Sequence, residues 1–194
     1  MKLIVVGGQS RNVGKTSLVA GIIQATSELR WTALKITQYG HGICSTSTMA
    51  CACSVEDPTC SYSIDPELNR DGRSDTSRFL CAGASEVYWV RTRVGQLGPA
   101  IPALRRMFEA RDFLIVESNS ILEFMRPDLY ISVLQPGLAD MKTSYLRYAS
   151  QADAYVVTGS GGPSANGRPV FQVAPPHYLS AELLDFIKAK TKLG

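Results

Sequence analysis

The sequence predicts an α/β protein with a mostly parallel, twisted sheet and helices on both faces of that sheet. Two observations predict this fold class. Stretches typical of strands alternate with stretches typical of helices along the whole chain. Several strand stretches, such as Leu3–Val6 and Phe113–Val116, are apolar at every position, which is typical of parallel strands covered on both faces. We therefore expect a three-layer, Rossmann-like architecture.

The length and composition fit one globular domain. The chain has 194 residues, of which 45% are hydrophobic and 19% are charged, and this is enough for a substantial core. We expect a single domain over residues 1–194, with one long insertion at about residues 38–70. The net charge of +3 and the lack of basic-aromatic alternation argue against a nucleic-acid partner. No signal peptide or membrane-spanning stretch is visible, so we expect a cytoplasmic protein with reduced thiols and no membrane partner.

The first elements follow from short apolar runs. Residues 2–7 predict a strand, residues 15–30 a helix, and residues 31–37 a second strand. Residues 38–70 show neither a helical nor a strand period, and they contain glycines, prolines and many hydroxyl residues. A loop of this length inside a compact domain is usually functional or disordered.

The later elements are predicted by helix caps, by apolar periodicity and by β-branched runs. Ser74 or Asp75 is expected to cap the first of these helices, and Ser180 the last. The expected elements are a helix over 74–82, a strand over 86–91, a helix over 102–110, strands over 112–117 and 128–134, a helix over 142–150, strands over 154–157 and 170–173, and a helix from 180. The helix over 102–110 should face inward through Leu104, Met107 and Phe108.

The most specific motif lies between the first strand and the first helix. Gly8 and Gly14 bound a loop that leads into Lys15 and Thr16. A strand, a glycine-bounded loop, Gly-Lys-Thr and a helix predict a phosphate-binding loop, because its backbone N–H groups and the helix dipole attract an anion. Lys15 would contact the β- and γ-phosphates, and the Thr16 hydroxyl would ligate Mg²⁺.

The spacing of this loop is unusual. Five residues separate its two glycines, where the standard motif has about four, and Gln9 stands at the usual glycine position. The nucleotide-binding residues predicted from the motif are Gly8, Asn12, Val13, Gly14, Lys15, Thr16 and Ser17.

Two charged residues stand at or near the ends of expected strands. Glu117 ends one strand and Lys35 lies near the end of another. Because ligands bind at the carboxyl ends of parallel strands, Glu117 would hold Mg²⁺ directly or through water. Lys35 would contact a terminal phosphate or an anionic substrate. The alternatives are a surface carboxylate for Glu117 and a lysine that extends to solvent for Lys35.

A second group of candidate functional residues, four cysteines and one histidine, lies in the 38–70 insertion. Thiolate and imidazole are suitable ligands for Zn²⁺ or an iron–sulfur cluster. The gaps between successive cysteines are longer or shorter than in common zinc motifs, so small packing residues remain an alternative to a metal site. Cys81, on a predicted helix, is expected in the core. The candidate metal ligands are His41, Cys44, Cys51, Cys53 and Cys60.

Three further groups could reach the same edge of the sheet, although surface roles suit them too. For the charged residues around residue 74, we favour the interpretation that they are ordinary exposed charges at the start of a helix. No Asn-Lys-x-Asp motif follows the strand over 154–157, so the sequence does not choose between ATP and GTP. The three groups are Asp71, Arg73, Asp75 and Arg78; Asp140 and Lys142; and Asn166 with Pro175–Pro176 as possible contacts of a base.

These motifs resemble known families. The loop from Gly8 to Thr16, the Leu34–Gly40 segment and Ile115–Glu117 are similar to the phosphate loop, lysine segment and metal-binding strand of dethiobiotin synthetase and related ATPases. Ser74–Ala84, the strand that follows it, and Arg168–Phe171 resemble the molybdopterin-guanine dinucleotide biosynthesis protein B family. Both families belong to the dimer-forming P-loop NTPases that include signal-recognition GTPases and MinD-type ATPases.

The resemblance, which extends over about residues 1–192, implies a Mg²⁺-dependent protein that binds and hydrolyses ATP or GTP in cofactor metabolism. It implies Lys15, Lys35 and Glu117 as catalytic residues and a homodimer as the assembly. Two alternatives remain. One is an accessory NTPase that carries Zn²⁺ or an iron–sulfur cluster and gates its delivery to a partner protein. The other is a ligase similar to dethiobiotin synthetase, with a small anionic substrate at Lys35.

Overall fold

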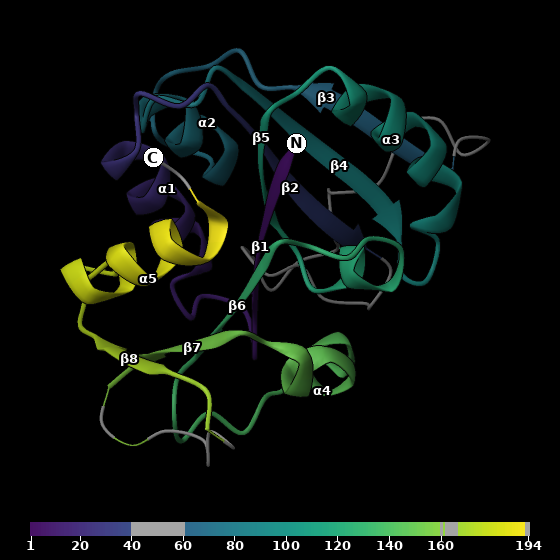
Figure 1. Cartoon of the computed structure of the whole chain (residues 1–194). Coiled ribbons are helices and arrows are strands. Elements are labelled where there is room, and N and C mark those ends of the chain that lie inside the picture. The colour runs from purple at the N-terminus through teal and green to yellow at the C-terminus, as the bar shows by residue number, and fades with distance from the viewer. Residues whose placement is uncertain (40–60, 160, 162–166, 193–194) are drawn as a thin grey trace.

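The computed structural model describes residues 1–39, 61–159, 161 and 167–192. Within this part of the chain, eight strands form one sheet in the order β3-β4-β2-β5-β1-β6-β7-β8. Neighbouring strands are parallel except β3, which runs antiparallel to β4. This mostly parallel sheet, with helices beside it, confirms the fold class expected from the sequence (Figure 1).

The element bounds agree closely with most of the sequence predictions. The strands are β1 Lys2–Gly8, β2 Trp31–Tyr39, β3 Tyr62–Pro66, β4 Glu86–Arg93, β5 Phe113–Glu117, β6 Leu129–Leu134, β7 Ala154–Thr158 and β8 Val170–Val173. The α-helices are α1 Lys15–Ala25, α2 Asp75–Cys81, α3 Ile101–Glu109, α4 Thr143–Tyr148 and α5 Ala181–Thr191. Short 3-10 helices are η1 Gly98–Ala100, η2 Ser120–Glu123 and η3 Ala149–Gln151. None of the helices in the described residues is long and apolar enough to cross a membrane.

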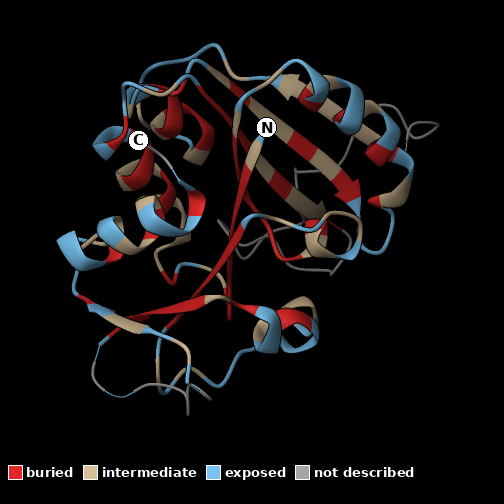
Figure 2. Cartoon of the chain, viewed as in Figure 1, coloured by how far each residue is buried: buried red, intermediate tan, exposed pale blue. Residues whose placement is uncertain are grey.

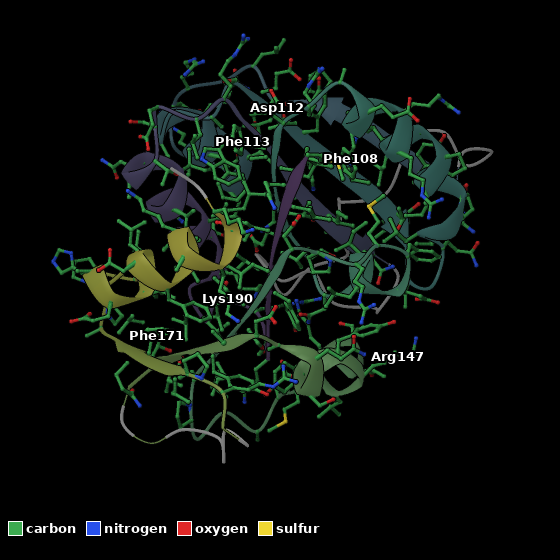
Figure 3. All side chains as sticks on the ribbon, viewed as in Figure 1. Phe108, Asp112, Phe113, Arg147, Phe171 and Lys190 are labelled. Atoms are coloured by element: carbon green, nitrogen blue, oxygen red, sulfur yellow. The ribbon has the colours of Figure 1, made fainter. Side chains whose placement is uncertain are left out.

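Two hydrophobic cores cover the two faces of the sheet. On one face α1, α2 and α5 pack over Ile4 and Val6 of β1, and on the other α3 and α4 pack with Leu3 and Val5 of the same strand. Each fully buried side chain of this size contributes about 1.5–3 kcal/mol. The arrangement is visible in Figure 1, the buried strands are red in Figure 2, and the side chains of both cores are drawn in Figure 3. Alternate residues of β1 therefore point into opposite cores, as the apolar run predicts.

The strand register brings the predicted site residues to one edge. Lys35 of β2 lies directly beside Glu117 of β5, and Glu117 lies beside Val6 of β1. Gly8, at the end of β1, pairs with Val133 of β6. Because these strands are parallel, their carboxyl ends and the loops that follow them gather at one edge of the sheet.

Two predicted boundaries are wrong. The first helix ends at Ala25 and not near residue 30, because the Thr26 hydroxyl donates to the carbonyl of Ile22 at 2.6 Å and accepts from the Trp31 indole at 2.9 Å. The stretch over 38–70 is also not structureless throughout. β2 continues to Tyr39, and β3 pairs antiparallel with β4. This short edge strand depends on its pairing with β4, and so it gives little signal in the sequence alone.

The helix caps agree with the predictions, but the placement of Cys81 does not. The Ser74 and Ser180 side chains accept hydrogen bonds at the starts of α2 and α5. Cys81 is exposed, because Phe79 and Leu80 fill the buried face at the end of α2 while the Cys81 thiol reaches the carbonyl of Arg70 at 3.4 Å. The expectation of a core cysteine is therefore wrong.

Candidate functional site

The loop between β1 and α1 has the backbone form that a phosphate-binding loop needs. Gly14 begins α1 with φ of +100°, a region that suits glycine. A Cβ at Gly14 would lie 2.1 Å from the ring of Tyr178, and a Cβ at Gly8 would lie 2.8 Å from the carbonyl oxygen of Val133. Both glycines are therefore required by their surroundings, as the motif predicts.

Gln9 explains the unusual spacing of the loop. This side chain is buried; its amide nitrogen donates to the carbonyl of Leu138 at 3.0 Å, and its amide oxygen accepts from the backbone of Gln135 at 3.1 Å. A glycine has no side chain to make these contacts. The residue that replaces the usual glycine therefore ties the loop to the segment that follows β6.

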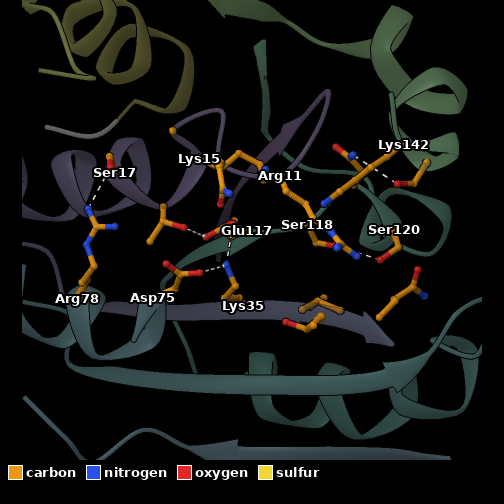
Figure 4. Close-up of a pocket in the computed structure, with 18 of the residues that line it drawn as sticks. Arg11, Lys15, Ser17, Lys35, Asp75, Arg78, Glu117, Ser118, Ser120 and Lys142 are labelled. Atoms are coloured by element: carbon orange, nitrogen blue, oxygen red, sulfur yellow. Dashed lines mark hydrogen bonds and ion pairs between the residues drawn. The ribbon is translucent and has the colours of Figure 1, made fainter. Parts of the chain in front are cut away.

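A cavity of about 400 Å³ opens beside this loop at the carboxyl edge of the sheet (Figure 4). Of the predicted nucleotide-binding residues, Asn12, Gly14, Lys15, Thr16 and Ser17 line it. Gly8 and Val13 are not among the lining residues, and Val13 is packed into the core. The other residues that line it are Arg11, Lys35, Ile36, Thr37, Gln38, Asp75, Arg78, Glu117, Ser118, Asn119, Ser120, Lys142, Ser144 and Tyr178.

Lys15 and Thr16 line the cavity and contact other residues of the expected site. The Lys15 ammonium donates to the carbonyl of Ser10 at 2.6 Å. Burial, followed by repulsion from Lys142, lowers the pKa of Lys15 to about 8. The Thr16 hydroxyl donates to the carboxylate of Glu117 at 2.8 Å. The two ends of the expected metal site, one on α1 and one on β5, are therefore in contact.

Lys35 is held between two carboxylates. Its ammonium forms ion pairs with Asp75 and with Glu117, the latter at 3.0 Å. Burial alone would lower the pKa of Lys35, but the charges of Glu117 and Asp75 outweigh it and raise that pKa. Burial likewise works to raise the pKa of Asp75, and Lys35 more than offsets it, so that this pKa is lowered. Lys35 therefore stays positive and both carboxylates have a partner.

The expectation that the charges around the start of α2 are ordinary exposed charges is partly wrong. Asp75 pairs with Lys35, and the Arg78 guanidinium donates to the hydroxyl of Ser17 at 3.0 Å, so both belong to the cavity. Asp71 and Arg73 fit the surface interpretation, since the Arg73 side chain is 89% exposed. The start of α2 lies over the end of β2, a contact between elements that the sequence does not reveal.

The segment after β5 supports the phosphate loop. The Asn119 amide accepts from the backbone N–H of Gly8 at 2.8 Å and donates to its carbonyl at 2.9 Å. The same amide lies 3.4 Å from the Ser144 hydroxyl. The Ser118 and Ser120 hydroxyls are 3.0 Å apart at the wall of the cavity. Asn119 thus fixes the end of β1 through two hydrogen bonds.

Of the two charged residues that follow β6, Lys142 lines the cavity, as one interpretation expects, whereas Asp140 is not among the lining residues. The Ser10 hydroxyl donates to the carboxylate of Asp140 at 2.9 Å. The backbone N–H of Lys142 donates to the carbonyl of Gln9 at 2.9 Å, and the Lys142 side chain lines the cavity. Burial, followed by repulsion from Arg11, lowers the pKa of Lys142.

The predicted soft-metal ligands fall outside the described residues, and so does Asn166. These ligands are His41, Cys44, Cys51, Cys53 and Cys60. Within the described ranges, no group of three or more histidine, cysteine, aspartate or glutamate side chains could hold a metal ion.

Comparisons with known proteins agree with this architecture. No protein-family model and no curated protein matches the sequence. Among solved structures, LpxK from Aquifex aeolicus in complex with ATP matches with a TM-score of 0.51 and 18% identity over 89% of this chain and 53% of LpxK. HypB from Helicobacter pylori in complex with nickel matches with a TM-score of 0.54 and 16% identity over 97% of this chain and 86% of HypB.

The chain has the P-loop NTPase fold. It spans about half of the length of LpxK, and at these identities the likeness concerns the fold. A further match, MobB from Bacillus subtilis, has a TM-score of 0.48 and 17% identity over 98% of this chain and 99% of MobB, a similarity too low to add to the assignment.

Proposed function

We propose that this protein binds a nucleoside triphosphate with Mg²⁺ and hydrolyses it. The observation that carries this proposal is the contact of Thr16 with Glu117 at 2.8 Å beside Lys15. A hydroxyl at the start of the helix after the loop, a carboxylate at the end of a neighbouring strand and a lysine in the same cavity are the groups that phosphoryl transfer uses. The P-loop NTPase fold supports the same conclusion.

The residues present fit a magnesium site. Thr16, Glu117 and Asp75 offer hydroxyl and carboxylate oxygens, which Mg²⁺ prefers. Asp75 and Glu117 already hold one positive charge, the Lys35 ammonium, so the site accommodates a cation. Bound Mg²⁺ would neutralise charge on the β- and γ-phosphates.

The other roles belong to the loop itself. The backbone N–H groups at the start of α1 would receive the phosphate oxygens. Lys15, now bonded to the Ser10 carbonyl, would exchange that acceptor for a phosphate oxygen and stabilise the charge that develops in the transition state. Lys35 would remain between Asp75 and Glu117 and hold both carboxylates in position.

The proposal is tested by titrating the purified protein with fluorescent ATP and GTP analogues, with Mg²⁺ and with EDTA. We expect saturable binding of at least one analogue that is stronger with Mg²⁺ present. Failure of both analogues to bind at millimolar concentration would overturn the proposal, and the comparison of the two also identifies the base.

The finer assignment rests on the sequence resemblance. We propose a role in cofactor metabolism close to that of the molybdenum-cofactor guanylylation accessory proteins, exercised by a single-domain protein that acts as a homodimer. Sedimentation of the protein with Mg²⁺ and a non-hydrolysable triphosphate tests the dimer, and a monomer under saturating nucleotide would contradict it.

A second candidate is an accessory NTPase that delivers a metal to a partner protein. It is favoured by the four cysteines and the histidine between residues 41 and 60, and HypB, which shares the fold, was crystallised in complex with nickel. Elemental analysis of protein purified without oxygen should then show near-stoichiometric metal, which replacement of Cys51 and Cys53 by serine should remove. Protein that is free of metal and has reactive thiols would end this candidate.

A further inference from the structure

Lys142 is a cation of the cavity that the proposed nucleotide chemistry does not use. Its side chain comes from the segment after β6 and lines the cavity, where it is partly buried. Among the residues that the structure describes, its ammonium has no hydrogen-bond or ion-pair partner. A partly buried charge without a partner is costly, so a site that keeps such a charge is suited to an anion.

Lys35 provides the contrast. Its ammonium forms ion pairs with Asp75 and Glu117. Because these carboxylates neutralise its charge, Lys35 attracts an anionic substrate only weakly. Lys142 has no carboxylate within bonding distance in the described part of the chain, and the one acidic residue nearby in sequence, Asp140, accepts a hydrogen bond from Ser10. An anion that enters the cavity would therefore be attracted to Lys142 more than to Lys35.

Several groups around Lys142 could receive the same anion. Arg11 of the phosphate loop is the charge that affects the pKa of Lys142 most strongly after burial, and hydroxyls of Ser118, Ser120 and Ser144 line the same cavity. Hydroxyl and guanidinium donors are suited to carboxylate and phosphate oxygens. Three separate segments of the chain thus contribute donors to the lining of one cavity.

This group does not include the residues expected to hold Mg²⁺. In Figure 4, Ser17, Arg78 and Asp75 lie on one side of Lys15 and Glu117, whereas Arg11, Ser118, Ser120 and Lys142 lie on the other. Among the described residues, the cavity lining contains five basic and two acidic side chains, so it favours anions.

We propose that Lys142, with Arg11 and the hydroxyls of Ser118, Ser120 and Ser144, forms a subsite for a second substrate that carries a carboxylate or a phosphate group. The subsite lies beside Lys15, on the side of the cavity away from Asp75 and Arg78. This inference rests on the proposed function, since it places a co-substrate next to the bound triphosphate.

The test measures anion binding to protein that is saturated with Mg²⁺ and a non-hydrolysable triphosphate. Inorganic phosphate and acetate are the two probes, and the readout is the rate at which an amine reagent modifies Lys142, followed by mass spectrometry. We expect one or both probes to slow modification of Lys142 in a saturable way, and the stronger probe shows which oxyanion the subsite prefers. Binding of that probe should weaken at least about tenfold in Lys142→Gln, measured by calorimetry.

Two variants keep this result interpretable. Lys142→Arg retains the charge and should bind the probe within a few-fold of the original protein, whereas Arg106→Gln, an exposed change on α3, should have no effect. The subsite would be refuted if neither probe changed the rate at which Lys142 is modified. It would also be refuted if Lys142→Gln bound the probe as tightly as the original protein does. If nucleotide itself fails to bind in the first step, the proposed function falls; if nucleotide binds and neither probe does, only this inference falls.

Discussion

Replacing Gly14 by alanine should destabilise the protein through two separable effects. The left-handed backbone at Gly14, with φ of +100°, costs a residue with a Cβ about 1–2 kcal/mol. The new Cβ would also lie 2.1 Å from the ring of Tyr178, and overpacking of this kind costs about 1–3 kcal/mol. The sum is about 2–5 kcal/mol, which for a domain of this length lowers Tm by about 4–20 °C.

A double-mutant cycle separates the two effects. In a Tyr178→Ala background the ring is gone, so Gly14→Ala should cost only the backbone part, and the coupling should be about 1–3 kcal/mol. Gly95→Ala is the matched control, because Gly95 has φ of +75° and a Cβ added there would meet nothing within 4 Å. Urea unfolding of the four proteins measures the cycle. An equal cost of Gly14→Ala in both backgrounds would refute the packing of Tyr178 over the phosphate loop.

Three further predictions concern the site. Glu117→Gln should lower Mg²⁺-dependent phosphate release by at least about 100-fold, while Glu109→Gln on α3 should not; equal rates would contradict the role of Glu117. Asn119→Ala should cost about 2–4 kcal/mol in urea unfolding, because it leaves the buried Gly8 backbone without two partners; a cost below about 1 kcal/mol would contradict the support assigned to Asn119. The pKa of Lys15 is about 8, and a bound polyanion raises it, so nucleotide binding near pH 9 should take up protons and weaken as pH rises. Calorimetry in two buffers of different ionisation enthalpy measures this uptake, and identical heats would speak against it.

Short sequence motifs and apolar strands were enough to predict part of the candidate site. The glycine-bounded loop with Lys15 and Thr16 is recognisable by itself, and the apolar strands that lead to Lys35 and Glu117 indicate a common edge because parallel strands share their direction. The register of β2, β1 and β5 bears out this reasoning, with Lys35 directly beside Glu117.

The sequence left the roles of Asp75, Arg78 and Lys142 open, and it did not single out Tyr178. Asp75 and Arg78 reach the cavity because α2 packs over the end of β2, and Lys142 does so because Gln9 holds the segment after β6. Tyr178 packs on Gly14 from far along the chain. Each of these contacts depends on tertiary packing, as does the edge strand β3, and no sequence period marks them.

The most direct test of the account is the hydrolysis of triphosphate by Lys15→Ala, compared with the original protein and with Arg106→Ala. We expect a folded Lys15→Ala protein, verified by circular dichroism, that releases phosphate at least about 100-fold more slowly, whereas Arg106→Ala retains full turnover. Undiminished turnover in the folded Lys15→Ala protein would contradict the assignment of this cavity as a nucleotide site.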